Sequence, residues 1–338
     1  MRKVLLLVLL ALVGSTIIFF FFKKEVLFAP TSPLPQLMKE KPLDKYTIEA
    51  LSATNFAPSE ITIGKVLKDE ENFTSYIFYF YPQGKKVSGL LVVPKKSGRH
   101  PVIVMFRGYI DREIYSTGIG TVRAAEAFAQ NGFIAISPDF LGYGQSDNPS
   151  ESPIEERFQT YIVALTLLES VKNLDSLLTS QKLQAGANSD KVFIWGHSNG
   201  GQIALTILEI TGKNIPTVFW APVSKPFPYS VLYYTDEFDD RGKMLRRVIA
   251  EFEKDYDVDK YSITGYFDKI NAPLSFHQGT EDEAVPVKWS NQLVEELKKL
   301  NKDVEYFTYS GDKHNFAQGS WQTVVNRNIA FFRKYLTE

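Results

Sequence analysis

The 338-residue chain contains no cysteine, which excludes disulfide bonds, thiolate metal sites and a cysteine nucleophile. It has only four histidines, so we expect no histidine-based metal cluster and no metal or other cofactor. The charges nearly balance: the chain has 38 lysines and arginines and 39 aspartates and glutamates, which gives a formal net charge of −1. Without a basic surplus, no nucleic-acid partner is expected.

The first 24 residues are predicted to form a signal anchor, a single N-terminal transmembrane helix. Arg2 and Lys3 precede an uncharged run at 4–22 that as a helix would span roughly 28 Å, about the hydrocarbon thickness of a bilayer. A cleaved signal peptide is the alternative, but no Ala-x-Ala site follows the run. An anchor ahead of a long domain predicts a membrane partner and places that domain outside the cytoplasm.

Residues 25–45 contain four prolines and little apolar periodicity, which is typical of an extended tether. One folded domain is expected at 46–338. Its first part, from about 60 to 95, has the alternation of antiparallel strands, at 61–66, 74–81 and 87–93.

From residue 101 apolar strands alternate with amphipathic helices, which predicts an α/β fold with a mostly parallel, twisted sheet and helices on both faces. A long helix is expected to begin at Ser152, its N-cap, with Glu155 closing a capping box. Residues 224–270 break the alternation and are rich in tyrosine, phenylalanine and acids. They are predicted to form a small cap insertion over the strand ends.

The clearest motif is Gly-His-Ser-Asn-Gly at 196–200, between a buried-type strand and an amphipathic helix. A strand that turns this sharply into a helix holds its turn residue in a strained conformation, and the flanking glycines avoid crowding. Ser198 is therefore the predicted nucleophile.

A serine hydroxyl needs a base, and the base needs an anion to orient it. His314 lies in a polar loop between the last strand and the last helix, and it is the predicted base. Asp282, in the loop after another strand, is the predicted acid, with Glu281 and Glu283 as rivals. The order Ser198, Asp282, His314 is the order expected for an α/β-hydrolase.

Two backbone N–H groups are predicted to stabilise the developing oxyanion. One belongs to Asn199, directly after the nucleophile, and the other to Tyr109, in the turn after the strand at 101–106. Arg107, in the same turn, either binds a carboxylate of the substrate or pairs with a nearby acid. For His100 a surface position is expected, for His197 a variable elbow position, and for His277 support of the acid loop.

These motifs resemble the α/β-hydrolase superfamily and, more narrowly, the catalytic domain of the prolyl oligopeptidase family of serine peptidases. The resemblance covers about residues 60–336 and rests on six segments, at 89–94, 107–109, 139–144, 196–201, 279–286 and 312–316. It implies Ser198 as nucleophile, Asp282 as orienting acid and His314 as base. The chain has no room for the N-terminal propeller that family peptidases often carry, and it has Arg107 where related hydrolases commonly have histidine.

The predicted function is a membrane-anchored serine hydrolase that cleaves a peptide or ester bond, with a small molecule or peptide as substrate. A prolyl oligopeptidase-type peptidase is the first choice and a carboxylesterase or acetyl esterase the second. A catalytically inactive binding domain is the alternative of another class.

Overall fold

The computed structural model describes residues 40–336, so the predicted anchor and most of the predicted tether lie outside the described residues. Residues from Leu43 onward group into one unit. Between residues 40 and 336, no helix combines the length and the apolar character that crossing a membrane requires.

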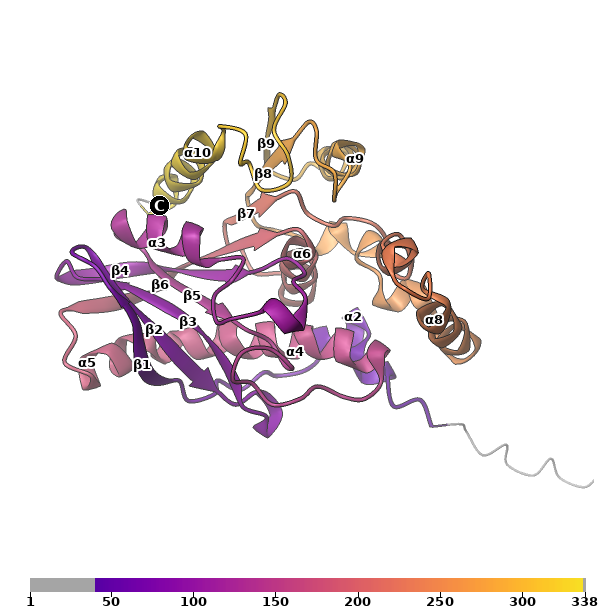
Figure 1. Cartoon of the computed structure of the whole chain (residues 1–338), viewed down its shortest axis with the longest axis horizontal. Helices are drawn as coiled ribbons and strands as arrows, with labels where there is room; N and C mark the ends of the chain where they lie inside the picture. Colours follow the sequence, from indigo (N-terminus) through magenta and orange to yellow (C-terminus); the bar gives the residue numbers. More distant parts are fainter. Residues whose placement is uncertain (1–39, 337–338) are drawn as a thin grey trace, which may run out of the picture. The chain divides into compact units, whose positions relative to one another are not determined.

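One nine-stranded sheet organises the chain (Figure 1), with strand order β1-β2-β3-β5-β4-β6-β7-β8-β9. Its first three pairings are antiparallel and the five that follow are parallel. The strands are β1 Thr62–Asp69, β2 Phe73–Phe80, β3 Val87–Pro94, β4 Gly98–Phe106, β5 Ile134–Pro138, β6 Ala185–His197, β7 Thr217–Trp220, β8 Leu274–Gly279 and β9 Val304–Tyr309. The predicted α/β class with a mostly parallel sheet is confirmed.

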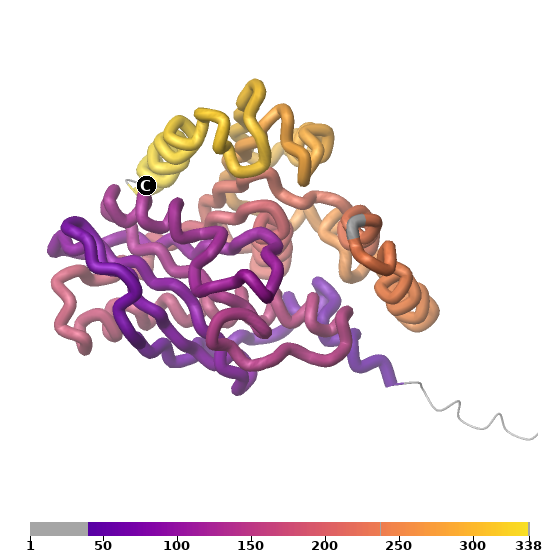
Figure 2. The backbone as a smooth tube through the Cα atoms, viewed as in Figure 1, coloured from indigo at the N-terminus to yellow at the C-terminus, as the bar shows by residue number. Residues whose placement is uncertain are grey.

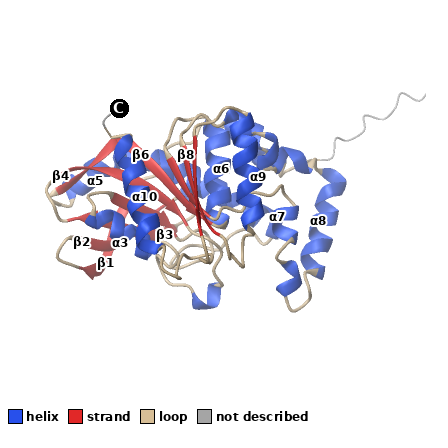
Figure 3. Ribbon diagram, turned by 90° about the horizontal axis from the view of Figure 1, so that it is seen from above, coloured by secondary structure: helices blue, strands red, loops and turns tan. Residues whose placement is uncertain are grey.

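Helices cover both faces of the sheet (Figure 3), because successive strand residues alternate between two buried apolar clusters. On β4, Val102 and Val104 belong to one cluster, and Ile103 and Met105 belong to the other. Helices α3 and α10 pack on the second face and the remaining longer helices on the first. The helices are α2 Ile48–Ser52, α3 Val122–Gln130, α4 Pro153–Ser170, α5 Leu174–Ser180, α6 Asn199–Thr211, α7 Tyr229–Leu232, α8 Lys243–Asp255, α9 Val287–Lys299 and α10 Trp321–Lys334.

The start of α4 differs in one detail from the sequence prediction. Ser152 is the N-cap and accepts a hydrogen bond from the N–H of Glu155. The Glu155 carboxylate does not return to Ser152. It accepts hydrogen bonds from Tyr46 and Ser150 instead, because the N-terminal segment lies against the first turn of α4 (Figure 2).

The segment 224–270 contains α7 and α8 and packs through aromatic rings on α4. The Phe158 ring of α4 stacks on Tyr261, with ring centroids 4.9 Å apart, and also contacts Phe227 and Phe252. Burial of these rings holds the segment against the helical layer. Its role as a cap over the strand ends stays a prediction.

Strands β4 and β6 begin earlier than their apolar residues predict. Residues 98–101 pair with 185–188 before a register shift brings Val102 opposite Val192. His100 lies in this extension and is only 6% exposed, so its predicted surface position is wrong. Its two ring nitrogens contact the carbonyls of Gly132 and Lys96, which satisfies a buried polar ring.

Candidate active site

Ser198 occupies the sharp turn between β6 and α6. Its backbone has φ 56° and ψ −120°, a conformation that a residue with a side chain rarely adopts. Hydrogen bonds to the end of β7 and to the segment after it hold the turn: the Ser198 N–H donates to the Trp220 carbonyl at 2.9 Å, and the Ser198 carbonyl accepts from the Val223 N–H at 3.0 Å. The strain is thus fixed by backbone contacts.

The glycines of the motif are required by close backbone approach. A methyl group at Gly200 would lie 2.0 Å from the Phe106 carbonyl oxygen, and one at Gly196 would lie 2.6 Å from the Gly200 oxygen. These distances are below any van der Waals contact, so a side chain at either position would displace the turn.

His314 and Asp282 form the second part of the site. The Nδ1 of His314 lies 3.0 and 2.9 Å from the two carboxylate oxygens of Asp282. The Asp282 side chain is fully buried, and that of His314 is 12% exposed. Burial acts to raise the pKa of Asp282, but the hydrogen bond and charge of His314, with two backbone N–H donors, hold it below its usual range.

The Asp282 carboxylate is held by three further donors, the N–H groups of Ala284 and Val285 and the side-chain amide of Gln278. Of its two rivals, Glu283 only accepts from the backbone N–H of His314, at 3.5 Å. Among the described residues, no hydrogen bond joins Glu281 to the His314 ring. Asp282 is therefore the carboxylate that can orient the imidazole.

Sequence reasoning missed Gln278 and assigned its role to the neighbouring His277. The His277 ring is buried and contacts Tyr309, Ser275 and Asn328, so its predicted support of the acid loop is wrong. Successive side chains of β8 point to opposite faces, and this alternation sends Gln278 to the acid loop and His277 away from it.

The loops of the acid and the histidine are tied to each other. The Glu281 N–H donates to the Asp312 carbonyl at 3.0 Å, and the Gly311 N–H donates to the Thr280 hydroxyl at 2.9 Å. A methyl group at Gly279 would lie 2.3 Å from the Asp312 oxygen. The acid loop and the histidine loop therefore pack directly against each other.

His197 connects the histidine loop to the serine turn. Its Nε2 lies 3.1 Å from the His314 carbonyl oxygen, and the two imidazole centroids are 4.5 Å apart. Burial, together with the nearby His314, lowers the pKa of His197 to about 3, so the ring is neutral and its Nε2–H can donate. No hydrogen bond joins Ser198 directly to His314 within residues 40–336. Such contacts are often loose before substrate binds.

The turn after β4 lies directly beside the serine. A methyl group at Gly108 would be 3.0 Å from Cβ and 3.5 Å from Oγ of Ser198. In the described part of the chain, neither the Tyr109 N–H nor the Asn199 N–H is used in a hydrogen bond. Both predicted oxyanion donors therefore flank the serine with unused N–H groups.

Arg107 does not pair with an acid among the described residues. Its guanidinium donates to the carbonyls of Gly108 and Asp139, at 2.9 and 2.8 Å, and lies 4.0 Å from the Tyr143 ring centroid. The Asp139 carboxylate is satisfied by donors of its own, among them Ser88 and Tyr115. Arg107 thus ties the turn after β4 to the loop after β5.

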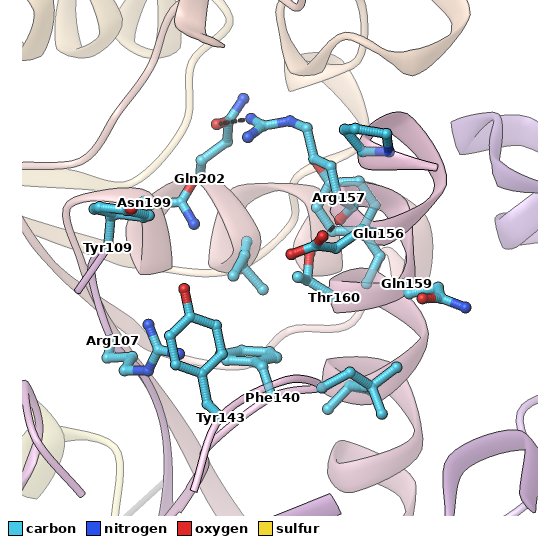
Figure 4. Close-up of a pocket in the computed structure, with 15 residues that line it drawn as sticks. Arg107, Tyr109, Phe140, Tyr143, Glu156, Arg157, Gln159, Thr160, Asn199 and Gln202 are labelled. Carbon is cyan, nitrogen blue, oxygen red and sulfur yellow. Dashed lines mark hydrogen bonds between the residues drawn. The ribbon is translucent and has the colours of Figure 1, made fainter. Parts of the chain in front are cut away.

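A pocket of about 180 Å³ opens beside these two turns (Figure 4). Tyr109 and Asn199 line it from the serine side, and the first turns of α4 line it from the other. Arg107 lies beside Tyr143, while Arg157 meets Gln202 at the opposite side of the pocket. The pocket thus reaches Asn199, the residue directly after Ser198.

Comparison with known proteins agrees with this geometry. The chain matches the Prolyl oligopeptidase family over residues 175–338 and the Dienelactone hydrolase family over residues 87–227. It is 29% identical over 258 residues to the uncharacterized peptidase YtmA of Bacillus subtilis, which covers 75% of this chain and 90% of that protein.

Two solved structures share the fold. Acetyl xylan esterase from Paenibacillus sp. R4 has a TM-score of 0.58 at 16% identity, over 88% of this chain and 96% of the esterase. Pyrococcus horikoshii acylaminoacyl peptidase has a TM-score of 0.55 at 18% identity, over 78% of this chain and 41% of the peptidase.

The chain is therefore a serine hydrolase with the α/β-hydrolase fold. Within that superfamily it is similar to the prolyl oligopeptidase family, whose match includes Ser198, Asp282 and His314.

Proposed function

We propose that the chain is a membrane-anchored serine hydrolase that cleaves a peptide or ester bond through an acyl-enzyme. Ser198 is the nucleophile, His314 the base and Asp282 the acid that orients the base. The pairing of buried Asp282 with His314, beside a strained serine turn, carries this proposal. It supplies the base and anion that a serine hydroxyl needs.

The reaction uses each group in turn. His314 Nε2 takes the Ser198 proton as Oγ bonds to the carbonyl carbon, and the N–H groups of Asn199 and Tyr109 bind the oxyanion. His314 then gives the proton to the leaving nitrogen or oxygen as its bond to carbon breaks. Water, deprotonated by His314, then bonds to the acyl carbon. The bond from that carbon to Ser198 Oγ breaks, His314 returns the proton to Oγ, and the acid leaves.

A prolyl oligopeptidase-type peptidase is the first choice of activity. The family match over 175–338 and the peptidase name of the Bacillus subtilis relative support it. A carboxylesterase or acetyl esterase is the second choice, supported by the Dienelactone hydrolase match, since ester cleavage uses the same acyl-enzyme. Arg107, which lines the pocket, would contribute to substrate binding by shaping the turn that carries Tyr109.

The membrane part of the proposal rests on the apolar run at 4–22. In fractionated cells the full chain should sediment with membranes, and protease added to intact cells should degrade its catalytic domain. Recovery of the intact protein from the cytosolic fraction would contradict both the anchor and the extracytoplasmic site.

Labelling with a fluorophosphonate probe tests the nucleophile. In this reaction the serine oxygen bonds to phosphorus and fluoride leaves. The full chain in detergent should be labelled, Ser198→Ala should not, and Ser310→Ala, at an exposed serine near the histidine loop, should be labelled like the parent. A folded parent that resists labelling would favour the inactive binding domain. A labelled parent is then assayed with aminoacyl 4-nitroanilides and 4-nitrophenyl acetate, which separates peptidase from esterase.

A further inference from the structure

The pocket beside the serine contains an arginine with no carboxylate partner. Arg157 of α4 donates one hydrogen bond within residues 40–336, to the side-chain oxygen of Gln202 at 2.6 Å. Its Nε is buried without an acceptor in that part of the chain. The side chain is half-buried, and a partly desolvated cation without a counter-ion is costly unless a ligand supplies one.

The other charged groups of the pocket are already engaged. Glu156 lines the pocket, but its carboxylate pairs with Arg112. Arg107 donates to two backbone carbonyls and packs on Tyr143. Arg107 also lacks a carboxylate and has a buried Nε without an acceptor, but both of its terminal nitrogens donate to carbonyls. Arg157 is therefore the cation of this pocket that keeps a terminal nitrogen without an acceptor, as far as the described residues go.

Gln202 links Arg157 to the reaction centre. It lies one helical turn after Ser198 and is 2% exposed, and its backbone N–H contacts the Ser198 carbonyl at 3.4 Å. Figure 4 shows the Arg157–Gln202 bond at the pocket that Tyr109 and Asn199 also line. A group bound at Arg157 would thus share one pocket with a carbonyl held by the predicted oxyanion donors.

We propose that this pocket binds a carboxylate carried by the substrate, with Arg157 as its counter-ion. This inference rests on the proposed function, since it names the substrate class of the same site. The planar guanidinium offers paired N–H groups that match a carboxylate, and Gln202 fixes its orientation. The carboxylate belongs either to the acyl part or to the leaving group.

Two pairs of esters distinguish these sources. Mono-4-nitrophenyl glutarate against 4-nitrophenyl valerate tests the acyl side, and 4-acetoxybenzoate against its methyl ester tests the leaving group. Each kcat/KM is divided by the rate of hydrolysis without enzyme. We expect the anionic ester to be preferred at least about tenfold in one pair. Arg157→Gln should reduce that preference roughly 10–100-fold, with a much smaller loss on the neutral ester.

Arg157→Lys should retain part of the preference, and Arg123→Gln should retain all of it, because Arg123 stacks on Trp321 outside the pocket. Equal losses on anionic and neutral esters in Arg157→Gln would overturn the inference, since they would mean that Arg157 only holds α4 to α6. Absence of a preference in both pairs would overturn it as well.

Binding of the same esters to the full chain that carries Ser198→Ala can be measured without hydrolysis, so this test does not depend on turnover. Calorimetry should show that the preferred anionic ester binds more tightly than its neutral partner, and that adding Arg157→Gln removes the difference. No difference in binding overturns the carboxylate site, whatever the activity. A parent that binds the anionic ester selectively but resists both turnover and fluorophosphonate contradicts the proposed function and leaves the site standing.

Discussion

The imidazole of His197 donates to the main-chain carbonyl of His314 over 3.1 Å and lies against its ring. The residue before the predicted nucleophile thereby holds the loop of the predicted base. Because His197 stays neutral at ordinary pH, with a pKa near 3, the contact persists over the range in which hydrolases work.

His197→Phe keeps an aromatic ring but removes this hydrogen bond. We expect kcat to fall roughly 3–10-fold, the effect of about 1 kcal/mol, with little change in KM. His100→Gln is the matched control, since His100 is also buried against backbone carbonyls but lies in the early part of β4, away from the serine. A similar loss of kcat in both variants would contradict the positioning role of His197.

Asp282→Asn should lower kcat by up to ~10⁴-fold, because an amide cannot stabilise the charged imidazole or fix its tautomer. Glu283→Gln should change kcat less than threefold, by about 0.5 kcal/mol or less. Steady-state kinetics on both variants, with thermal unfolding to verify that each is folded, measures the contrast. Comparable effects at the two positions would argue against Asp282 as the orienting acid.

Gly200→Ala should destabilise the protein by roughly 3 kcal/mol or more, since its methyl group would overlap the Phe106 carbonyl. Gly265→Ala, which meets nothing within 4 Å, should change stability by no more than about 0.5 kcal/mol. Urea unfolding of the two variants gives the difference. A stable Gly200→Ala protein would mean that the serine turn tolerates displacement.

Glu209 of α6 gives the protein a pH-dependent stability. Both carboxylate oxygens are buried without a partner among the described residues, and burial raises the pKa of the group well above its ordinary value. A carboxyl with a raised folded-state pKa contributes its stability below the unfolded pKa and loses it as pH rises.

Glu209→Gln should therefore gain stability relative to the parent as pH increases from 4 to 8. The measurement is the difference in unfolding free energy across that range. Glu253→Gln, at an exposed position, should show no such trend. A flat difference for Glu209→Gln would show that the carboxyl is ionised in the folded protein.

Local patterns predicted most of the fold. Strands with apolar alternation lie within a few residues of their predicted ends, and Ser152 caps α4 as its sequence indicates. The polar start of β6 and the short helix α5 carry no such periodicity, and they form because backbone pairing and burial of Leu174 and Leu178 compensate.

The nucleophile motif is local, so Ser198 could be placed from its neighbours alone. The contacts that surround it could not. Arg157 meets Gln202 from another helix, and Gln278 rather than His277 reaches Asp282. These contacts depend on how distant segments pack, and no spacing within the chain encodes them.

The backbone ties between the acid loop and the histidine loop have a mechanical consequence. Because these hydrogen bonds connect the loops of Asp282 and His314, the two residues are positioned as a pair. Alignment of the site then depends on how this pair is placed relative to Ser198. A substitution at residue 197 would therefore change how the pair is placed against Ser198 without removing the hydrogen bonds between Asp282 and His314.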